Sequence, residues 1–429
     1  MSAFDRSDPG KDAHFGGAAP ASAGGSAVIK RRILYVEGCR DGSVGGSHIS
    51  LLRLLSNLDR KRYEATVLYY DDHYVADLVR KLDIAVIVLP REAPSQLASR
   101  LPPGRPGSRA LSMALLPMQK LFNFAWHFLR PALVHALLLR TGRFDLVHLN
   151  NSVNSNHEWM LAARIARVPL VSHERGAGGP LSRSSLWLAG WAKRHICVST
   201  HIRDALVANG LGADRVVVVY NGLDPGEVRV RREAREVRTE FGIPDAVPVI
   251  GVVGNVKRWK GQEVVIRATA LLAERWPTLR LLLVGLAAPD DPYPEELARL
   301  TRELRIEDRV IFTGFQEHPA DFMNAMDVVV HSSITPEPFG LVNIEAMYLG
   351  KPVVATRLGG PIEIFDNGRN GFLVDPENPR ALADQLAALL SDPVLRKRVG
   401  EVAHATVMKR FTIAQTLRGV AGVYDEVVR

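Results

Sequence analysis

The sequence predicts an α/β protein made of two doubly wound, Rossmann-like domains in tandem. Short apolar runs rich in β-branched residues alternate with helical patterns, which is typical of parallel sheets with crossover helices. A turn at Asn221-Gly222 and a charged linker, Leu223–Pro244, separate two such series. At 429 residues the chain is also too long for one ordinary core.

Each series supplies the strands of one expected sheet. The first comprises Ile33–Val36, Ala65–Tyr69, Ile84–Leu89, Leu146–Leu149, Pro169–Ser172, Ile196–Val198 and Val216–Val219. The second comprises Val249–Val253, Leu279–Val284, Val310–Phe312, Val328–Val330, Val353–Ala355 and Phe372–Val374. Ligands of such sheets bind beyond the carboxyl ends of the strands, so we expect the active site in a cleft where the two domains face each other.

The N-terminal tail and the cysteines indicate a cytoplasmic protein. Residues 1–28 are rich in Gly, Ala and Ser and contain no apolar core of a signal peptide, so we expect a disordered tail. Cys39 and Cys197 are far apart and form neither a metal-binding spacing nor a disulfide framework, which suits a reducing compartment.

The basic charge lies in the N-terminal half. Residues 1–224 carry 28 Lys and Arg against 18 Asp and Glu, a net charge of +10, whereas the rest carries 26 against 28, a net charge of −2. No acidic residue occurs between Glu92 and Asp145. The basic amphipathic insertion, 100–143, contains an apolar run, Leu111–Leu139, that prolines and charges interrupt too often for a comfortable membrane span.

Two interpretations of this insertion remain open. A basic segment that bears aromatic residues fits the inner surface of an anionic membrane, to which the protein would bind peripherally. Alternatively, the insertion is a helical hairpin that packs on its own domain. A nucleic-acid partner is not expected, because the charge lies in one insertion without a recognition motif.

The most informative segment is His331–Gly350, which follows an apolar strand and leads into a helix that should begin near Phe339-Gly340. The first N–H groups of a helix have no internal partner and bind anions, and Gly340 would let a ligand approach closely. Glu337 precedes this helix and Glu345 lies on it; carboxylates accept hydrogen bonds from hydroxyls. Diphosphate and hydroxyl recognition together indicate a nucleotide-sugar. Taken alone, such glutamates are also ordinary helix-dipole or surface residues.

The surrounding pattern supports the first interpretation. Gly350-Lys351-Pro352 ends the helix, a strand follows, and Gly359-Gly360-Pro361 forms the next loop. This stretch resembles the retaining glycosyltransferases of family 4, which have the GT-B fold and two glutamates separated by seven residues. The resemblance implies an acceptor-binding domain over 29–224, a donor-binding domain over 225–410 and a C-terminal helix over 411–429 that crosses back.

The resemblance also implies roles for two glycine-containing loops. Gly45-Gly46-Ser47 follows the first strand and would face the donor diphosphate and the acceptor; it lacks the G-x-G-x-x-G and G-K-[ST] patterns of other nucleotide sites. In the second domain, Lys260 occupies the family's Lys position. Asn255 stands where the family has Arg, and Arg258 is the candidate replacement. Alone, each pattern also fits a tight turn or a solvated basic loop.

The remaining site residues rest on the same resemblance. His173 follows a strand of the first domain and would hydrogen-bond the transferred sugar. The turn that contains Phe315 would contact the nucleobase. The expected catalytic residues are His173, Glu337, Lys260 and Arg258. The expected donor-binding residues are Gly254, Asn255, Phe315, Phe339, Gly340, Leu341, Val342 and Glu345.

The resemblance therefore implies a retaining glycosyltransferase. It would move a hexose from a nucleoside-diphosphate-sugar to a hydroxyl of a glycan or lipid-linked acceptor in cell-surface polysaccharide synthesis. No metal or cofactor is expected, since no D-x-D follows a strand and cations with a helix terminus supply the positive charge. A nucleotide-sugar epimerase of the same fold and a catalytically silent sugar-nucleotide binding protein are the alternatives.

Overall fold

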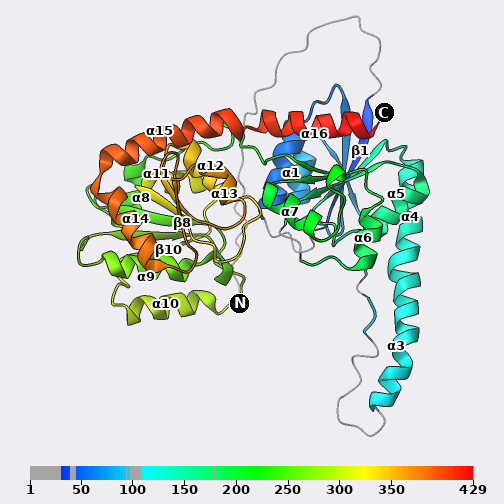
Figure 1. The fold of residues 1–429 in the computed structure, drawn as a ribbon, viewed down its shortest axis with the longest axis horizontal. Coiled ribbons are helices and arrows are strands. Elements are labelled where there is room, and N and C mark those ends of the chain that lie inside the picture. The colour runs from blue at the N-terminus through cyan, green and yellow to red at the C-terminus, as the bar shows by residue number, and fades with distance from the viewer. Residues whose placement is uncertain (1–29, 39–44, 93, 97–107, 177–178, 429) are drawn as a thin grey trace, which may run out of the picture.

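The computed structural model contains two parallel sheets with helices on both faces, which confirms the predicted fold class (Figure 1). It describes residues 30–38, 45–92, 94–96, 108–176 and 179–428. The expected disordered tail over 1–28 lies outside these residues, as do Cys39, Arg100 and Arg105 of the predicted features.

The first sheet has seven parallel strands in the order β3-β2-β1-β4-β5-β6-β7. Their bounds are β1 Arg31–Glu37, β2 Tyr63–Tyr69, β3 Ala85–Val88, β4 Leu146–Asn150, β5 Leu170–Glu174, β6 Arg194–Cys197 and β7 Val216–Val218. The order reverses between β1 and β4, so both strands end at a switch point beside the Gly-rich loop.

The helices of the first domain cover both faces of its sheet. They are α1 Gly46–Ser56, α2 Tyr74–Lys81, α3 Ser108–Phe124, η2 Ala125–Leu129, α4 Arg130–Thr141, α5 His157–Ala166, α6 Arg183–Ala189, α7 Thr200–Ala208 and η3 Ala213–Arg215. The apolar face of α1 packs on the sheet, where Leu51, Leu54 and Leu55 are buried against β1 and β2 residues.

The second sheet has six parallel strands in the order β10-β9-β8-β11-β12-β13. Their bounds are β8 Val249–Val253, β9 Arg280–Val284, β10 Val310–Gly314, β11 Val328–His331, β12 Val353–Thr356 and β13 Phe372–Val374. All thirteen strands lie at the places where the sequence predicts strands, because buried parallel strands are nearly continuous apolar runs.

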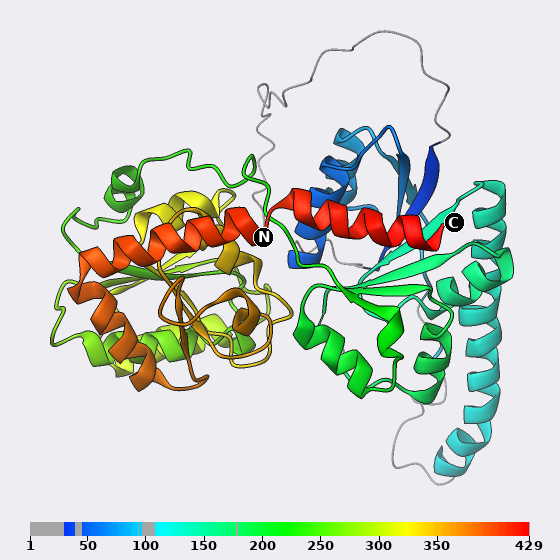
Figure 2. The same ribbon diagram turned by 45° about the horizontal axis from the view of Figure 1, so that its top comes forward.

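The helices of the second domain alternate with these strands. They are α8 Ala234–Glu240, η4 Arg258–Lys260, α9 Gln262–Leu272, α10 Tyr293–Glu303, α11 Pro319–Ala325, α12 Leu341–Tyr348, α13 Pro361–Ile364, α14 Pro379–Ser391 and α15 Pro393–Arg410. The last helix, α16 Ile413–Val427, follows α15 but lies on the first domain, as the turned view shows (Figure 2).

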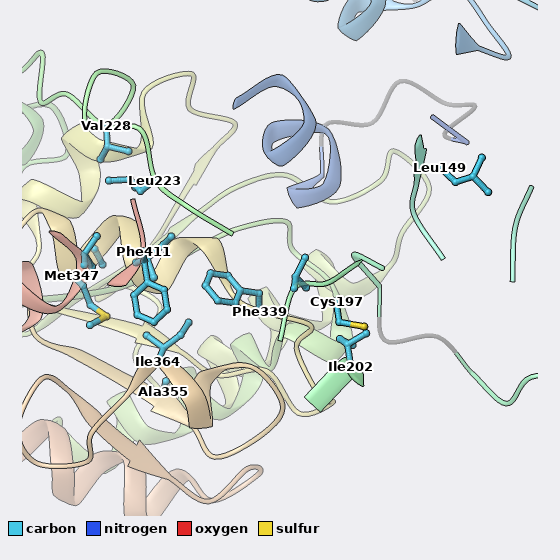
Figure 3. Close-up of a cluster of buried hydrophobic side chains, with 14 of the residues drawn as sticks. Leu149, Cys197, Ile202, Leu223, Val228, Phe339, Met347, Ala355, Ile364 and Phe411 are labelled. Atoms are coloured by element: carbon cyan, nitrogen blue, oxygen red, sulfur yellow. The ribbon is translucent and has the colours of Figure 1, made fainter. Parts of the chain in front are cut away.

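The two crossings between the domains are joined to each other. Leu223 donates its N–H to the Phe411 carbonyl at 2.8 Å, and Ile413 donates its N–H to the Leu223 carbonyl at 2.9 Å. Tyr220, Phe339 and Phe411 form an aromatic trio with ring centroids 5.6–6.0 Å apart. Figure 3 shows Leu223, Phe339 and Phe411 within the buried cluster that continues from one domain into the other.

The insertion differs from the hairpin that the sequence left open as one interpretation. α3, the π-helical turn η2 and α4 form a continuous helical run from Ser108 to Thr141, and α3 projects away from the sheet (Figure 1). α4 packs closely on the domain, where His135 stacks on the Trp159 ring at 3.9 Å. Within the described part of the chain, no helix is long and apolar enough to span a bilayer.

The crossing geometry predicts a strong effect of one added methyl group. A Cβ on Gly222 would lie 2.4 Å from the Thr412 carbonyl oxygen, so Gly222→Ala should lower the free energy of unfolding by about 1–3 kcal/mol. Gly422→Ala is the control: it lies in α16 with nothing within 4 Å, and should be neutral or stabilising by up to about 1 kcal/mol. Urea unfolding of both variants measures this difference, and equal midpoints would contradict the packing described for the crossing.

Candidate active site

Glu337 is the centre of the candidate site in the second domain. It lies in the loop between β11 and α12, and its side chain is 13% exposed. Its carboxylate Oε2 accepts hydrogen bonds from Lys260 Nζ at 2.7 Å and Ser333 Oγ at 3.1 Å, and His331 Nε2 lies 3.4 Å away. The predicted pair of Glu337 and Lys260 is therefore in direct contact, although 77 residues separate them.

The surroundings of Glu337 keep its carboxylate ionised. Burial raises the pKa of Glu337, but the hydrogen bond with His331 and the charge of Lys260 outweigh this effect and lower the pKa to about 2. An ionised carboxylate only accepts hydrogen bonds, so Glu337 cannot act as a general acid near neutral pH. It is suited to bind hydroxyl groups.

Two glycines hold the backbone around Glu337. Gly360 donates its N–H to the Glu337 carbonyl at 2.8 Å. Gly359 has a left-handed φ of 64°, and a Cβ there would lie 2.3 Å from the same carbonyl oxygen. The Gly359-Gly360 loop that carried part of the sequence resemblance therefore has a physical role, since only glycine permits this close approach.

Lys260 is positioned by a contact between two loops. It ends the short helix η4 after β8, where its carbonyl accepts a bond from Ser332 Oγ at 2.9 Å. Gly261 follows with φ 68°, and a Cβ on it would lie 2.1 Å from the Ser332 carbonyl oxygen. The loops after β8 and β11 are thereby joined, and Lys260 reaches Glu337 from the side.

Arg258 and Asn255 lie apart from this pair. The Arg258 guanidinium donates to Glu296 at 2.6 Å, stacks over the Tyr293 ring and is 59% exposed. Asn255 is exposed, and its carbonyl accepts from Gln262. The structure therefore does not bring Arg258 to Glu337, and a role for Arg258 at the diphosphate stays a prediction that would require it to leave Glu296.

The start of α12 has the features expected of an anion site. Gly340 has a left-handed φ of 95°, and the helix begins at Leu341, one residue beyond the predicted start. Phe339 is buried in the aromatic trio, whereas Leu341 and Val342 are partly exposed. Among the described residues, both polar side-chain atoms of the buried Asn343 lack a hydrogen-bond partner. The packing of the Phe339 ring on Tyr220 and Phe411 fixes the loop that carries Glu337.

Glu345 extends from α12 toward the first domain. Its Oε1 accepts a bond from Arg53 Nη2 at 2.7 Å, and Arg53 Nε donates to Glu227 Oε2 at 2.7 Å. Arg53, His331 and Ser333 are not among the site residues that the sequence predicts. For Arg53, the signal in the sequence is a single charged residue among the leucines of α1.

The Gly-rich loop of the first domain reaches the same helix. Gly45 precedes α1, which begins at Gly46, and Ser47 lies in its first turn. A Cβ on Gly46 would lie 3.5 Å from Leu341 Cδ1, so the two predicted donor loops approach each other. Residues 39–44 of this loop lie outside the described residues.

His173 is the penultimate residue of β5 in the first domain and is fully buried. Its Nδ1 lies 3.3 Å from both His148 Nε2 and Arg175 Nη2. Burial and the charge of Arg175 lower the pKa of His173 well below its usual value, so the ring is neutral. A guanidinium only donates, so Nδ1 accepts and Nε2 carries the hydrogen. Within the described residues this buried Nε2 has no partner, which leaves a donor for a ligand.

Arg175 joins the polar residues at the strand ends. It donates to Asn150 Oδ1 at 2.5 Å and to Asn221 Oδ1 at 2.8 Å, which links β4, β5 and the crossing. Glu174 instead accepts from the Val153 N–H at 2.8 Å and from Ser172, so it holds the β4 loop.

The expected nucleobase turn lies at the end of β10. Gly314 has a left-handed φ of 71°, and Gln316 Nε2 donates to the Thr313 carbonyl at 2.9 Å. Gly254 follows β8 and donates its N–H to the Val284 carbonyl. Phe315 is 65% exposed, which leaves its ring accessible. Its contact with a base stays a prediction.

Comparison with known families covers most of the chain. Residues 233–406 match the family model of Glycosyl transferases group 1, and residues 44–227 match that of Glycosyltransferase Family 4. The D-inositol 3-phosphate glycosyltransferase of Corynebacterium glutamicum (strain R) is 31% identical over 314 residues, which are 66% of this chain and 73% of that protein. The N-acetyl-alpha-D-glucosaminyl L-malate synthase of Bacillus anthracis is 31% identical over 214 residues, which are 50% of this chain and 54% of that protein.

Solved structures with the same architecture include complexes with nucleotides. The structure of Anabaena Alr3699/HepE in complex with UDP matches with a TM-score of 0.75 and 26% identity. The match covers 92% of this chain and 100% of the Anabaena chain. Its complex with UDP-glucose matches with a TM-score of 0.74 and 27% identity, over 92% of this chain and 99% of the Anabaena chain. A glycosyltransferase from Rickettsia africae has a TM-score of 0.78 with 21% identity, over 94% of this chain and 99% of that chain, and shares the fold.

The lowered pKa of Glu337 predicts an acid-dependent loss of stability. A carboxylate whose folded pKa lies below its unfolded value stabilises the fold above the unfolded pKa, and this contribution disappears as the pH falls through the folded pKa. For Glu337 the window runs from about pH 4.5 down to about 2, and the contribution is at most about 3 kcal/mol. Glu337→Gln should therefore lose less stability than the wild type between pH 5 and pH 2.

Denaturant unfolding at several pH values measures this effect. Glu303→Gln is the matched control, because Glu303 is 61% exposed and lies on α10, away from the site. It should keep the acid sensitivity of the wild type. The interpretation of Glu337 would be wrong if Glu337→Gln and Glu303→Gln showed the same dependence on pH.

Proposed function

This chain is a glycosyltransferase of family 4 with the GT-B fold, and we propose that it transfers a hexose from a uridine-diphosphate-sugar to a hydroxyl acceptor with retention of the anomeric configuration. The observation that carries the proposal is the ionised carboxylate of Glu337, held by Lys260 beside the start of α12. The choice of uridine rests on the UDP and UDP-glucose complexes of the Anabaena protein.

In the proposed reaction, the diphosphate binds at the start of α12. Leu341 and Val342 lie there with the unpaired N–H groups of a helix start, and Lys260 adds a positive charge beside them. As the bond to the anomeric carbon breaks, negative charge develops on the leaving phosphate. The helix start and Lys260 stabilise this charge without rearrangement. We propose that these groups make an added metal unnecessary.

The transferred sugar would lie between the two domains. Glu337 accepts hydrogen bonds from its hydroxyls, and the Nε2–H of His173 donates one from the opposite domain. Glu337 is not proposed as a nucleophile, because Lys260, Ser333 and His331 already surround its Oε2. Retention then follows a same-face path, in which the leaving phosphate takes the proton of the acceptor hydroxyl.

We place the acceptor at the carboxyl edge of the first sheet. A cavity of about 480 Å³ lies there, lined by residues from the β3 and β4 loops and from the insertion. Amide side chains, Asn123, Asn154 and Asn156, and the rings of Phe124 and Phe128 line it. Amides and aromatic faces suit the hydroxyls and apolar faces of a sugar. A glycan or lipid-linked glycan of cell-surface polysaccharide synthesis is the proposed acceptor.

We also propose that the insertion binds an anionic membrane on its cytoplasmic face. Large apolar side chains are exposed along it: Leu116, Met118, Leu121, Phe122, Phe124, Trp126, Leu129, Leu133, Val134 and Leu137. Lys120 and Arg130 lie among them, and no acidic residue does. Such a helix face can enter the headgroup region, and basic residues each add about 1 kcal/mol near an anionic surface. The predicted Leu111 and Met113 have side chains outside the described residues.

The function is tested with UDP-glucose and related UDP-hexoses in EDTA. We expect UDP to raise the unfolding temperature of the protein and, with an acceptor present, the sugar to appear in product with its anomeric configuration retained, as read by proton NMR. An epimeric UDP-sugar, or its hydrolysed epimeric sugar with UDP, formed without transfer to the acceptor would instead identify an epimerase. Binding without turnover for every acceptor would identify a silent sugar-nucleotide binding protein.

Among site variants, Lys260→Ala should lower kcat/KM for the UDP-sugar far more than Lys257→Ala. Lys260 contacts Glu337 at 2.7 Å, whereas Lys257 is exposed three residues before it and serves as the matched control. Loss of a charged hydrogen-bond partner corresponds to about 1.5–3 kcal/mol, which is roughly 10- to 100-fold in rate. Steady-state kinetics decide the matter, and a larger effect of Lys257→Ala would show that the cation at the diphosphate has been misassigned.

For the membrane, the protein should co-sediment with vesicles that contain anionic phospholipid, and binding should weaken as salt rises. Leu121→Asp should abolish most of this binding, because Leu121 is 69% exposed on α3. Leu271→Asp, on a helix of the second domain and 50% exposed, is the control and should bind as the wild type does. Equal binding by both variants, or none by the wild type at low salt, would exclude this surface.

A further inference from the structure

Arg53 of the first domain forms an ion pair with Glu345, one of the residues expected to bind the donor. Arg53 lies in the last turn of α1 and is 4% exposed. Its Nη2 donates to Glu345 Oε1 at 2.7 Å, across the boundary between the domains. α1 also approaches α12 at its other end, where Gly46 faces Leu341. α1 of the first domain and α12 of the second domain are therefore in contact near both of their ends, beside the expected donor site.

Packing of the first domain does not require this arginine. Leu51, Leu54 and Leu55 supply the face of α1 that packs on its own sheet. Arg53 points the other way, where Glu345 and Glu227 raise the pKa of the guanidinium although burial opposes them. Burying a charge is costly unless it is paired with good geometry, so a buried arginine between two carboxylates indicates a requirement for position.

The guanidinium has one donor group left over. Its Nε and Nη2 hold Glu227 and Glu345, whereas Nη1 is buried and, within the residues that the structure describes, has no hydrogen-bond partner. The linker side is fixed as well, because Asn57 of the same helix end donates to Asp224 at 3.0 Å. Arg53 is therefore anchored on the linker, and Glu345 is the partner that belongs to the second domain.

We propose that Arg53 is a positioning residue for donor recognition: it fixes the Glu345 carboxylate so that the remaining oxygen, Oε2, receives the hydroxyls of the donor ribose. This inference rests on the proposed UDP-sugar donor. A planar guanidinium holds one carboxylate oxygen in a defined orientation, which a flexible lysine ammonium does not. Ribose recognition in the second domain then depends on contact with the first.

The test compares two nucleotides that differ only in the ribose hydroxyls. Calorimetry measures the Kd of UDP and of 2′,3′-dideoxyuridine 5′-diphosphate for the wild type and for Arg53→Gln. We expect Arg53→Gln to weaken UDP by about 10-fold or more, because a charged hydrogen bond is involved, and to leave the dideoxy nucleotide nearly unchanged. Arg53→Lys, which keeps the charge, should fall between the wild type and Arg53→Gln.

Two further variants separate positioning from folding. Glu345→Gln in the Arg53→Gln background should add little to the loss with UDP, because both changes remove the same interaction. Arg62→Gln is the matched control: Arg62 pairs with Asp425 at an exposed site, and UDP should bind this variant as it binds the wild type. Unfolding temperatures of all variants report whether each one folds.

Three results would overturn the inference. Equal losses for both nucleotides would mean that Arg53 contacts the diphosphate or only supports the domain interface. Unchanged UDP binding by Arg53→Gln would remove any role in donor binding. If the wild type bound neither nucleotide, the proposed UDP-sugar donor itself would fail, and the inference would fail with it.

Discussion

The candidate active site depends on the packing of Tyr220, Phe339 and Phe411. Tyr220 precedes the first crossing between the domains, Phe411 begins the second, and Phe339 belongs to the loop that carries Glu337. Their rings join three segments that are distant in the sequence within one buried cluster. Because Phe339 is fixed, α12 begins at a defined place, and Glu345 on this helix meets Arg53 of the first domain.

Buried charges around this cluster are each compensated by a partner from another element. Lys260 compensates Glu337, two carboxylates compensate Arg53, and Asn150 and Asn221 accept the bonds of Arg175, whose pKa burial lowers to about 10. Buried ion pairs rarely add stability over apolar packing, because desolvation is costly. Their concentration at the carboxyl ends of two sheets therefore indicates binding and catalysis, where a fixed charge is useful before the ligand arrives.

The site residues of the second domain are easier to predict from the sequence than those of the first domain. In the second domain, the loop, the helix start and both glutamates lie within Glu337–Glu345, so one contiguous pattern predicts the contact surface. In the first domain, the polar groups come from α1, from two strand ends and from the crossing. The basic loop after β8 shows the same difference. Lys260 contacts Glu337, whereas Arg258 pairs with Glu296 of α10. No local sequence pattern indicates where α10 lies relative to this loop.

By itself the sequence determined the thirteen strands, the two-domain order and the family, because apolar periodicity and the spacing of Glu337 and Glu345 are local properties of the chain. It did not indicate that residues 108–141 of the insertion form one continuous helical run, that His173 is neutral with a hydrogen on Nε2, or that Arg53 holds Glu345. Those properties depend on which groups meet across two domains, and on how far each is removed from water. Only the tertiary structure sets distances and burial between residues that are hundreds of positions apart, and electrostatic energies follow from these two quantities.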